Sequence, residues 1–276
     1  MGTPLGDFVR AKRDSIQPTT LGLPERGRRR SPGLRRLDLA DRAGISVEYL
    51  TRIEQGRDRN PSVAVVNALA DALSLDPAER AHLRYLAKIT GGECVAHPQP
   101  APPRREVRPS VLETLRLLEP GLALVTNRLG DILARTGSYE AVMSGTGLLD
   151  AEIPNLTRYV FTDPRARDLF TDWDAVADEQ AFDLWLGPSV ENSEWFTAEL
   201  APVAGADFTR RMNRHVVPAR GVLRLRHPSG TALRLRRETL DITEEAQQLL
   251  VLLPADEETA GAVERLRRPP RLRAIS

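Results

Sequence analysis

Apolar residues recur three and four positions apart in five short segments of the first 90 residues, and polar, glycine or proline residues separate these segments. This spacing puts the apolar side chains of each segment on one face of an α-helix. Five helices that each bury one face predict a compact all-α domain over residues 1–90. We expect the helices over about 4–16, 39–43, 47–55, 63–73 and 77–89.

The second and third of these helices are joined by a turn that contains Gly44 and Ser46. Glycine favours the left-handed backbone that often ends a helix, and a serine hydroxyl can accept a backbone N–H where the next helix begins. Leu50 and Ile53 then face inward. Two short helices joined in this way form a helix-turn-helix unit, although an ordinary helical hairpin would have the same pattern.

The helix over 47–55 is expected to lie in the major groove of DNA, with its first turns against the edges of the bases. Arg52 can donate to guanine, and Glu48 can accept from the amino group of cytosine. The sequence therefore predicts a recognition surface that consists of Ser46, Val47, Glu48, Tyr49, Thr51 and Arg52.

Basic residues around this unit are expected to contact DNA phosphates. Residues 1–60 carry 13 Lys and Arg against 8 Asp and Glu, whereas the remaining 216 residues carry 26 against 30. This uneven charge favours an anionic partner for the first domain. The loop over 17–33 supplies part of the excess, and it can equally be a solvated surface loop. The candidate phosphate contacts are Arg28, Arg29, Arg30, Arg36, Arg57 and Arg59.

Glycine and proline residues over 91–108 predict a linker. From 109 to 256, short strands flank several helical segments, which predicts an α+β domain with helices on one side of its sheet. Alternating leucine and arginine residues over 221–240 predict a hairpin with one solvent-exposed cationic face. Residues 257–276 are expected to form a basic C-terminal tail. The expected strands span about 122–126, 132–135, 221–226, 231–240 and 247–253, and the helices 111–118, 138–144, 153–161, 164–170, 172–186 and 192–201.

Aromatic residues are concentrated in the middle of the second domain. Helices that lay aromatic side chains over a small sheet can enclose an apolar cavity. The same residues can also simply fill a hydrophobic core, and both interpretations stay open at this point. The residues concerned are Phe161, Phe170, Trp173, Phe182, Trp185, Trp195 and Phe196.

Both domains resemble known families. Residues 35–73 resemble the Xre family of helix-turn-helix regulators, through Leu39-Ala40, the run from Ala43 to Ser46, the run from Tyr49 to Gly56, and Asn60-Pro61-Ser62. Arg36 stands where that family often has glutamine. The second domain resembles the PAS-like ligand-binding domain of MmyB-like regulators, through Val125-Thr126-Asn127-Arg128, the run from Phe161 to Arg167, Asp172-Trp173 and Glu238-Thr239-Leu240.

The second resemblance implies a small-molecule ligand of fatty-acyl-like chemistry. Gly137-Ser138 departs from the pair of residues usual in the family, which affects the expected lining of the pocket. The residues expected to line it are Val125, Leu133, Tyr139, Leu156, Tyr159, Phe161, Phe182 and Leu223.

Motifs of enzymes are missing from the sequence. It has no glycine-rich phosphate loop after a strand and no nucleophile elbow, so no catalytic residues and no cofactor are expected. Cys94 and His97 lack the second pair of ligands that a zinc site needs. A protein–protein adaptor that uses a helix-turn-helix-like bundle, with the second domain as an interaction module, is the alternative function.

The remaining features favour a cytoplasmic, nucleoid-associated protein. Cys94 is the single cysteine, so no internal disulfide can form, which fits a reducing compartment. The first residues do not resemble a secretory signal, and no apolar run approaches the roughly 18 residues of a membrane span. One helix-turn-helix unit reads only half of a symmetric site, so we expect a homodimer on double-stranded DNA.

Overall fold

The computed structural model describes residues 3–22, 33–91, 105–184, 194–214, 217–218, 220–242 and 245–267. Contacts between Cα atoms divide the chain into two compact units. The first consists of residues 1–99 with 212–217, and the second of residues 100–211 with 218–276. Each unit contains its own hydrophobic core, so each can be understood from its own residues.

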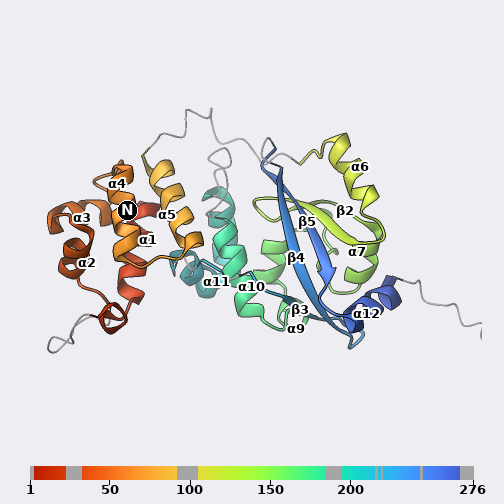
Figure 1. Cartoon of the computed structure of the whole chain (residues 1–276). Coiled ribbons are helices and arrows are strands. Elements are labelled where there is room, and N and C mark those ends of the chain that lie inside the picture. Colours follow the sequence, from red (N-terminus) through yellow and green to blue (C-terminus); the bar gives the residue numbers. More distant parts are fainter. Residues whose placement is uncertain are drawn as a thin grey trace, which may run out of the picture. The chain divides into compact units, whose positions relative to one another are not determined.

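The first unit is all-α, which confirms the prediction (Figure 1). In its described part the elements are α1 (Pro4–Ser15), the 3-10 turn η1 (Pro18–Leu21), α2 (Arg36–Ala43), α3 (Val47–Glu54), α4 (Val63–Ala72) and α5 (Pro77–Thr90). Helix α1 packs against α3 and α5, and α2 packs against α3 and α4. The side chains that these contacts bury completely include those of Leu5, Phe8, Leu39, Leu50, Ile53 and Leu69.

The predicted turn between α2 and α3 is present, and its local chemistry is the expected one. Gly44 ends α2 in the left-handed conformation, with φ of 64°. The Ser46 hydroxyl oxygen then accepts a hydrogen bond from the Tyr49 backbone N–H, at 3.0 Å. The two residues stop one helix and start the next within three positions, which is what lets α2 and α3 cross so closely.

The second unit is built on an antiparallel sheet of five strands in the order β2-β1-β5-β4-β3. Strand β1 pairs with its neighbour in sequence, β2, and also with β5 from the far end of the domain. The sheet is therefore complete only when the last strands return beside the first. The strands are β1 (Leu122–Asn127), β2 (Ile132–Arg135), β3 (Leu223–Arg226), β4 (Ala232–Ile242) and β5 (Gln247–Pro254).

Helices cover both faces of this sheet, not one face as predicted. All six residues of β1 are buried. Leu122 and Leu124 point into a large core that also receives α7, α8, α9, α10 and α12, whereas Ala123 and Val125 point into a smaller core under α6. Successive residues of a strand face opposite sides of the sheet, so a strand that is covered on both faces can be apolar at consecutive positions. This explains the apolar run from Leu122 to Val125 in β1. The helices are α6 (Pro109–Leu117), α7 (Gly137–Met143), α8 (Leu156–Thr162), α9 (Arg165–Leu169), α10 (Trp173–Asp183), α11 (Glu194–Arg214, interrupted at Gly205) and α12 (Glu257–Arg267).

Residues 257–267, expected in a basic tail, form helix α12 instead. Ala262 and Val263 are buried in the large core, and the Thr259 hydroxyl accepts a hydrogen bond from the Arg234 backbone N–H at 3.2 Å. Thr259, Ala262 and Val263 stand three and four positions apart, so the helical spacing was present in the sequence. The second domain thus extends at least to Arg267.

Candidate nucleic-acid interface and ligand pocket

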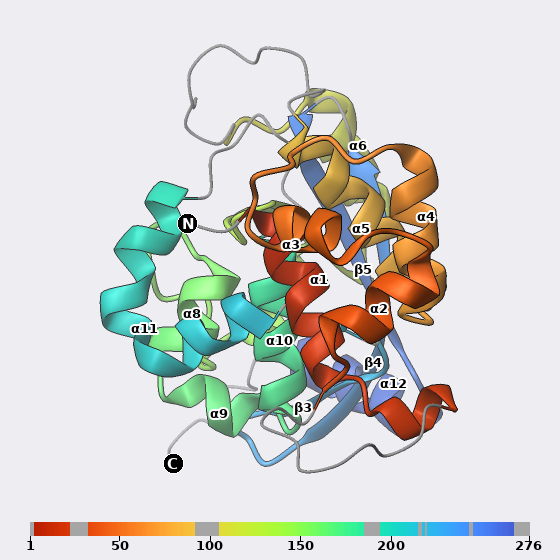
Figure 2. The ribbon, with the colours of Figure 1, turned by 90° about the vertical axis from the view of Figure 1, so that its left-hand side faces the viewer.

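Helix α3 lies at the surface of the first unit, on the side that faces the viewer in Figure 2. Leu50 and Ile53 are fully buried and fix the helix to the core. Ser46 and Glu48 in its first turn, and Arg52 one turn later, are exposed. This arrangement leaves one side of a well-anchored helix free for a partner, which is how a recognition helix is held.

The other three residues predicted for this surface are half-buried. Val47 and Tyr49 pack against the edge of the core. Thr51 donates its hydroxyl hydrogen to the Val47 carbonyl oxygen, at 2.8 Å. These three side chains therefore combine an accessible edge with a part in holding the helix.

Arg52 is held in place by neighbours on both sides. Its Nη2 lies 3.3 Å from Asp58 Oδ2, and its guanidinium carbon lies 6.0 Å from the centre of the Tyr49 ring. Burial, followed by the negative charge of Asp58, raises the pKa of Tyr49 above its ordinary value. The arginine side chain remains 58% exposed, so it can reach a partner while its position is restricted.

The last turn of α3 carries a buried charge that the sequence analysis missed. The Glu54 carboxylate is completely buried and lies 2.7 Å from Arg13 Nε and 2.6 Å from Arg36 Nε. Arg10 Nη2 also donates to the Glu54 carbonyl oxygen, at 2.6 Å. Glu54 stands four positions after Leu50, so its helical spacing already placed it on the inward side.

Arg36 therefore has a second role beside the predicted phosphate contact. Its Nε is committed to Glu54, but the side chain is still 44% exposed. Arg57 and Arg59, which follow α3, are exposed. Arg28, Arg29 and Arg30 lie outside the described residues. Among the described candidates, Arg36, Arg57 and Arg59 keep surface that phosphates can reach.

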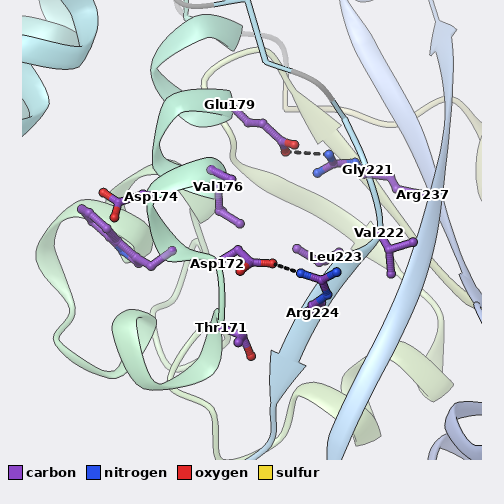
Figure 3. A pocket seen from close by; sticks show the side chains of 12 residues that line it. Thr171, Asp172, Asp174, Val176, Glu179, Gly221, Val222, Leu223, Arg224 and Arg237 are labelled. Carbon is purple, nitrogen blue, oxygen red and sulfur yellow. Dashed lines mark hydrogen bonds and ion pairs between the residues drawn. The ribbon is translucent and has the colours of Figure 1, made fainter.

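The second unit contains a cleft of about 550 Å³ between helix α10 and the strands β3 and β4 (Figure 3). Val176, Val222 and Leu223 supply its apolar surface. The cleft is bordered by two ion pairs that connect the helix side to the strand side. Asp172 Oδ2 lies 2.9 Å from Arg224 Nη1, and Glu179 Oε2 lies 2.5 Å from Arg237 Nη2.

The Glu179–Arg237 pair is the more buried of the two. Its side chains are 8% and 11% exposed, against 47% and 53% for Asp172 and Arg224. Arg237 faces inward because it follows Leu233 and Leu235 at every second position of β4, and both leucines are buried. The alternation was visible in the sequence, where the doubled arginine at 236 and 237 puts one arginine on each face.

Trp173 forms the helix-side wall of the cleft. Its indole N–H donates to the Val160 carbonyl oxygen at 3.0 Å, and the guanidinium carbon of Arg167 lies 3.6 Å from the centre of its ring. Arg211 approaches the same ring at 5.1 Å. These contacts account for the Asp172-Trp173 motif as an anchor at the start of α10.

A second, much smaller cavity of about 30 Å³ lies beside the first and shares Arg237 with it. Its walls are mostly polar and include Asn127, Gln180 and Asp183. Burial raises the pKa of Asp183 above its ordinary value, although the nearby Arg220 opposes the shift. The interior between α10 and the sheet is therefore partly polar.

The residues predicted to line one ligand pocket are not gathered in one place. Leu223 lines the large cleft and Leu156 the small cavity. Tyr139, Tyr159 and Phe161 belong to the large core, and Phe182 is buried. Val125 and Leu133 lie under α6 on the opposite face of the sheet. Side chains alternate along each strand, so the pairing register of β1 and β2 decides which face each of these two residues occupies.

The aromatic residues mainly fill the core. The Phe161 ring lies 4.8 Å from the Phe208 ring and 6.2 Å from the Trp173 ring, edge to face in both cases. The Tyr159 hydroxyl donates to the Thr146 carbonyl oxygen at 2.7 Å. Burial raises the pKa of Tyr139 and of Tyr159, so both phenols stay neutral. Trp185 lies outside the described residues.

The chain combines a surface helix after a capped turn with a domain that has a cleft over a small sheet, and two family matches identify this combination as a ligand-sensing transcription regulator. The helix-turn-helix domain family matches residues 25–83, and the family described as MmyB-like transcription regulator ligand binding domain matches residues 107–267. The chain belongs to the MmyB-like transcription regulators. A search of the curated proteins gives no match.

In the described part of the chain, none of the helices has the length and apolar character that spanning a membrane requires. No group of three or more His, Cys, Asp or Glu side chains that could hold a metal ion occurs there. Cys94 and His97, considered above as metal ligands, lie outside the described part of the chain.

Proposed function

We propose that this protein is a sequence-specific DNA-binding regulator whose second domain senses a small ligand. The observation that carries the proposal is the exposed first turn of α3, held from behind by Leu50, Ile53 and the buried Glu54 carboxylate. A helix fixed in this way loses little conformational entropy when it enters a groove, so binding energy is available for contacts with bases.

Within this proposal, Arg52 donates to guanine and Glu48 accepts from cytosine. Ser46, Val47, Tyr49 and Thr51 complete the contact with the groove. Phosphates are bound by Arg36, Arg57 and Arg59, together with the arginines at 28–30. The first domain acts in the manner of Xre regulators, as a homodimer that places two recognition helices on successive major grooves of nucleoid DNA in the cytoplasm.

The large cleft of the second domain is the proposed ligand site. Val176, Val222 and Leu223 can contact an apolar chain, and the two ion pairs that border the cleft can bind a polar head group. An elongated molecule with these two parts, such as a fatty-acyl-like compound, matches this lining in a PAS-like domain. Native mass spectrometry of protein purified from its host tests this, because a retained ligand adds a defined mass.

DNA selection from a random duplex pool, followed by gel shifts across salt concentrations, tests the DNA-binding proposal. Arg52→Ala should lose discrimination between the selected and random duplexes, because it removes a base contact. Arg29→Ala should weaken both equally and flatten the salt dependence. Arg59→Ala, which removes a proposed phosphate contact near α3, is the matched comparison for Arg52→Ala: it should weaken both duplexes equally and keep the discrimination between them. A chain that binds no duplex even at low salt would favour the protein–protein adaptor instead.

A further inference from the structure

The outer face of the hairpin β3–β4 carries a row of arginines. Leu225, Leu233 and Leu235 point into the large core and are almost completely buried. The residues between them must point the opposite way, because side chains alternate along a strand. We call the resulting surface the arginine face, and it consists of Arg224, Arg226, Arg234 and Arg236, all of which are exposed.

The register of the hairpin brings these charges close together. Arg224 and Arg234 are direct partners across the two strands, a position where like charges destabilise a sheet. Each has an acidic neighbour, since Arg224 lies 2.9 Å from Asp172 and Arg234 lies 3.1 Å from Asp256. The central pair is therefore partly neutralised within the domain.

Arg226 and Arg236 lie at the two ends of the face and make no ion pair with any described residue. In the register, Arg226 pairs with Ala232 and thus lies four positions from Arg236 along the hairpin, which corresponds to about 13 Å at the usual strand rise. The next outward residue on β4 is the exposed Glu238, which limits the cationic surface on that side.

Folding does not cover this surface in the described part of the domain. Helix α12 contacts β4, but Ala262 and Val263 join the large core on the other face of the sheet. Helix α6 covers the outer side of β1 and β5, where Ala123, Val125 and Leu249 are buried. A cross-strand pair of like charges flanked by two further unneutralised cations is thus maintained at the surface, at a cost to the stability of the hairpin.

We propose that the arginine face binds the phosphate backbone of DNA outside the bases read by α3. This inference rests on the proposed DNA-binding function of the first domain. Arginine forks match phosphate oxygens in a bidentate manner, and a row about 13 Å long equals the rise of roughly four base pairs along the helix axis. Because both domains belong to one chain, the second contact forms at high effective concentration once the first has formed.

The test compares two double variants of the full chain. R226A/R236A removes the two unneutralised arginines of the face. R116A/R265A removes the same charge from exposed arginines of α6 and α12 and is the matched control. Both are measured on a short duplex that contains only the sequence selected from the random pool, and on a duplex two helical turns longer at each end.

The wild type and R116A/R265A should bind the long duplex more tightly than the short one. R226A/R236A should lose this advantage, with roughly tenfold weaker binding to the long duplex near physiological salt and a salt slope smaller by about 1.8 for each chain bound. Its binding to the short duplex should match the wild type, and its thermal unfolding midpoint should equal or slightly exceed the wild-type value, because two unneutralised cations are removed. The footprint on the long duplex should shorten at its edges.

Equal affinities of wild type and R226A/R236A for the long duplex, with intact binding to the short one, would overturn the inference and point to an acidic protein as the partner of the face. Failure of the wild type to bind either duplex would instead refute the proposed DNA-binding function itself. A parallel loss in R116A/R265A would show a general charge effect and would also overturn the inference.

Discussion

The carboxylate of Glu54 lies 2.7 Å from the Nε atom of Arg13, and the two side chains are 0% and 8% exposed. The pair connects the last turn of α3 to α1 beneath the proposed recognition surface. A paired charge in a core is costly to separate, because the remaining partner stays buried without compensation. The position of α3 therefore depends on this contact as well as on Leu50 and Ile53.

Glu54→Gln should destabilise the first unit by about 3 kcal/mol, because Arg13 would lose its buried counter-charge and keep only Asp14, which is 49% exposed. Urea unfolding followed by circular dichroism measures the change. Glu48→Gln, on the exposed side of the same helix, is the matched control and should leave stability within about 0.5 kcal/mol of the wild type. Equal midpoints for the two variants would mean that the buried pair does not hold α3.

Ser46→Ala should cost about 1 kcal/mol, because the Tyr49 backbone N–H loses its acceptor at the start of α3. Ser46→Thr keeps a hydroxyl and should recover most of the loss. The denaturant midpoints of the three proteins give the comparison. An alanine variant as stable as the wild type would show that water replaces the cap without cost.

Two glycines in left-handed conformations should respond differently to alanine. Gly44 has φ of 64° and an added Cβ would meet no atom within 4 Å, so Gly44→Ala should cost only the backbone strain of about 1–2 kcal/mol. An added Cβ at Gly56, with φ of 68°, would lie 2.9 Å from the Thr3 backbone nitrogen. Gly56→Ala should therefore be more destabilising than Gly44→Ala. Thermal unfolding of the two variants measures the difference. A lower unfolding midpoint for Gly44→Ala than for Gly56→Ala would contradict this packing argument.

Asp183 should make the stability of the second domain depend on pH. Its pKa is raised in the folded state by burial, so the folded state holds the proton more tightly than the unfolded state. Stability is then greatest below the ordinary carboxyl pKa of 3.8 and falls as the pH rises through the folded value. Asp183→Asn should remove this part of the slope and stabilise the domain at neutral pH. Unfolding curves from about pH 4 to about pH 8, between the ordinary carboxyl pKa and neutrality, provide the measurement. An unchanged slope would contradict the assignment.

Val222→Trp should fill the cleft between α10 and β3 and reduce the amount of small molecule that copurifies with the protein. Val203→Trp places the same residue at an exposed site on α11, 69% exposed, and should leave ligand retention unchanged. Native mass spectrometry of the two variants from the same host gives the occupancies. Full retention in Val222→Trp would exclude this cleft as the ligand site.

Much of the local structure follows from residues close together in the chain. The helices of the first unit, and the turn through Gly44 and Ser46, depend on apolar spacing and on capping groups a few positions apart, and all were predicted. The candidate pocket was predicted less well. Val125 and Leu133 were grouped with Tyr159 and Leu223, but the register of the sheet places the two pairs on opposite faces.

The sequence by itself determined the helix-turn-helix unit, the strands and the alternation that makes one face of β3–β4 cationic, because these depend on local periodicity. Only the tertiary structure decided that Glu54 meets Arg13 and Arg36, that α12 completes the core, and that Glu179 faces Arg237 across a cleft. These contacts join residues 18 to 58 positions apart. Their partners are chosen by how helices and strands pack in space, and no local pattern in the chain contains that information.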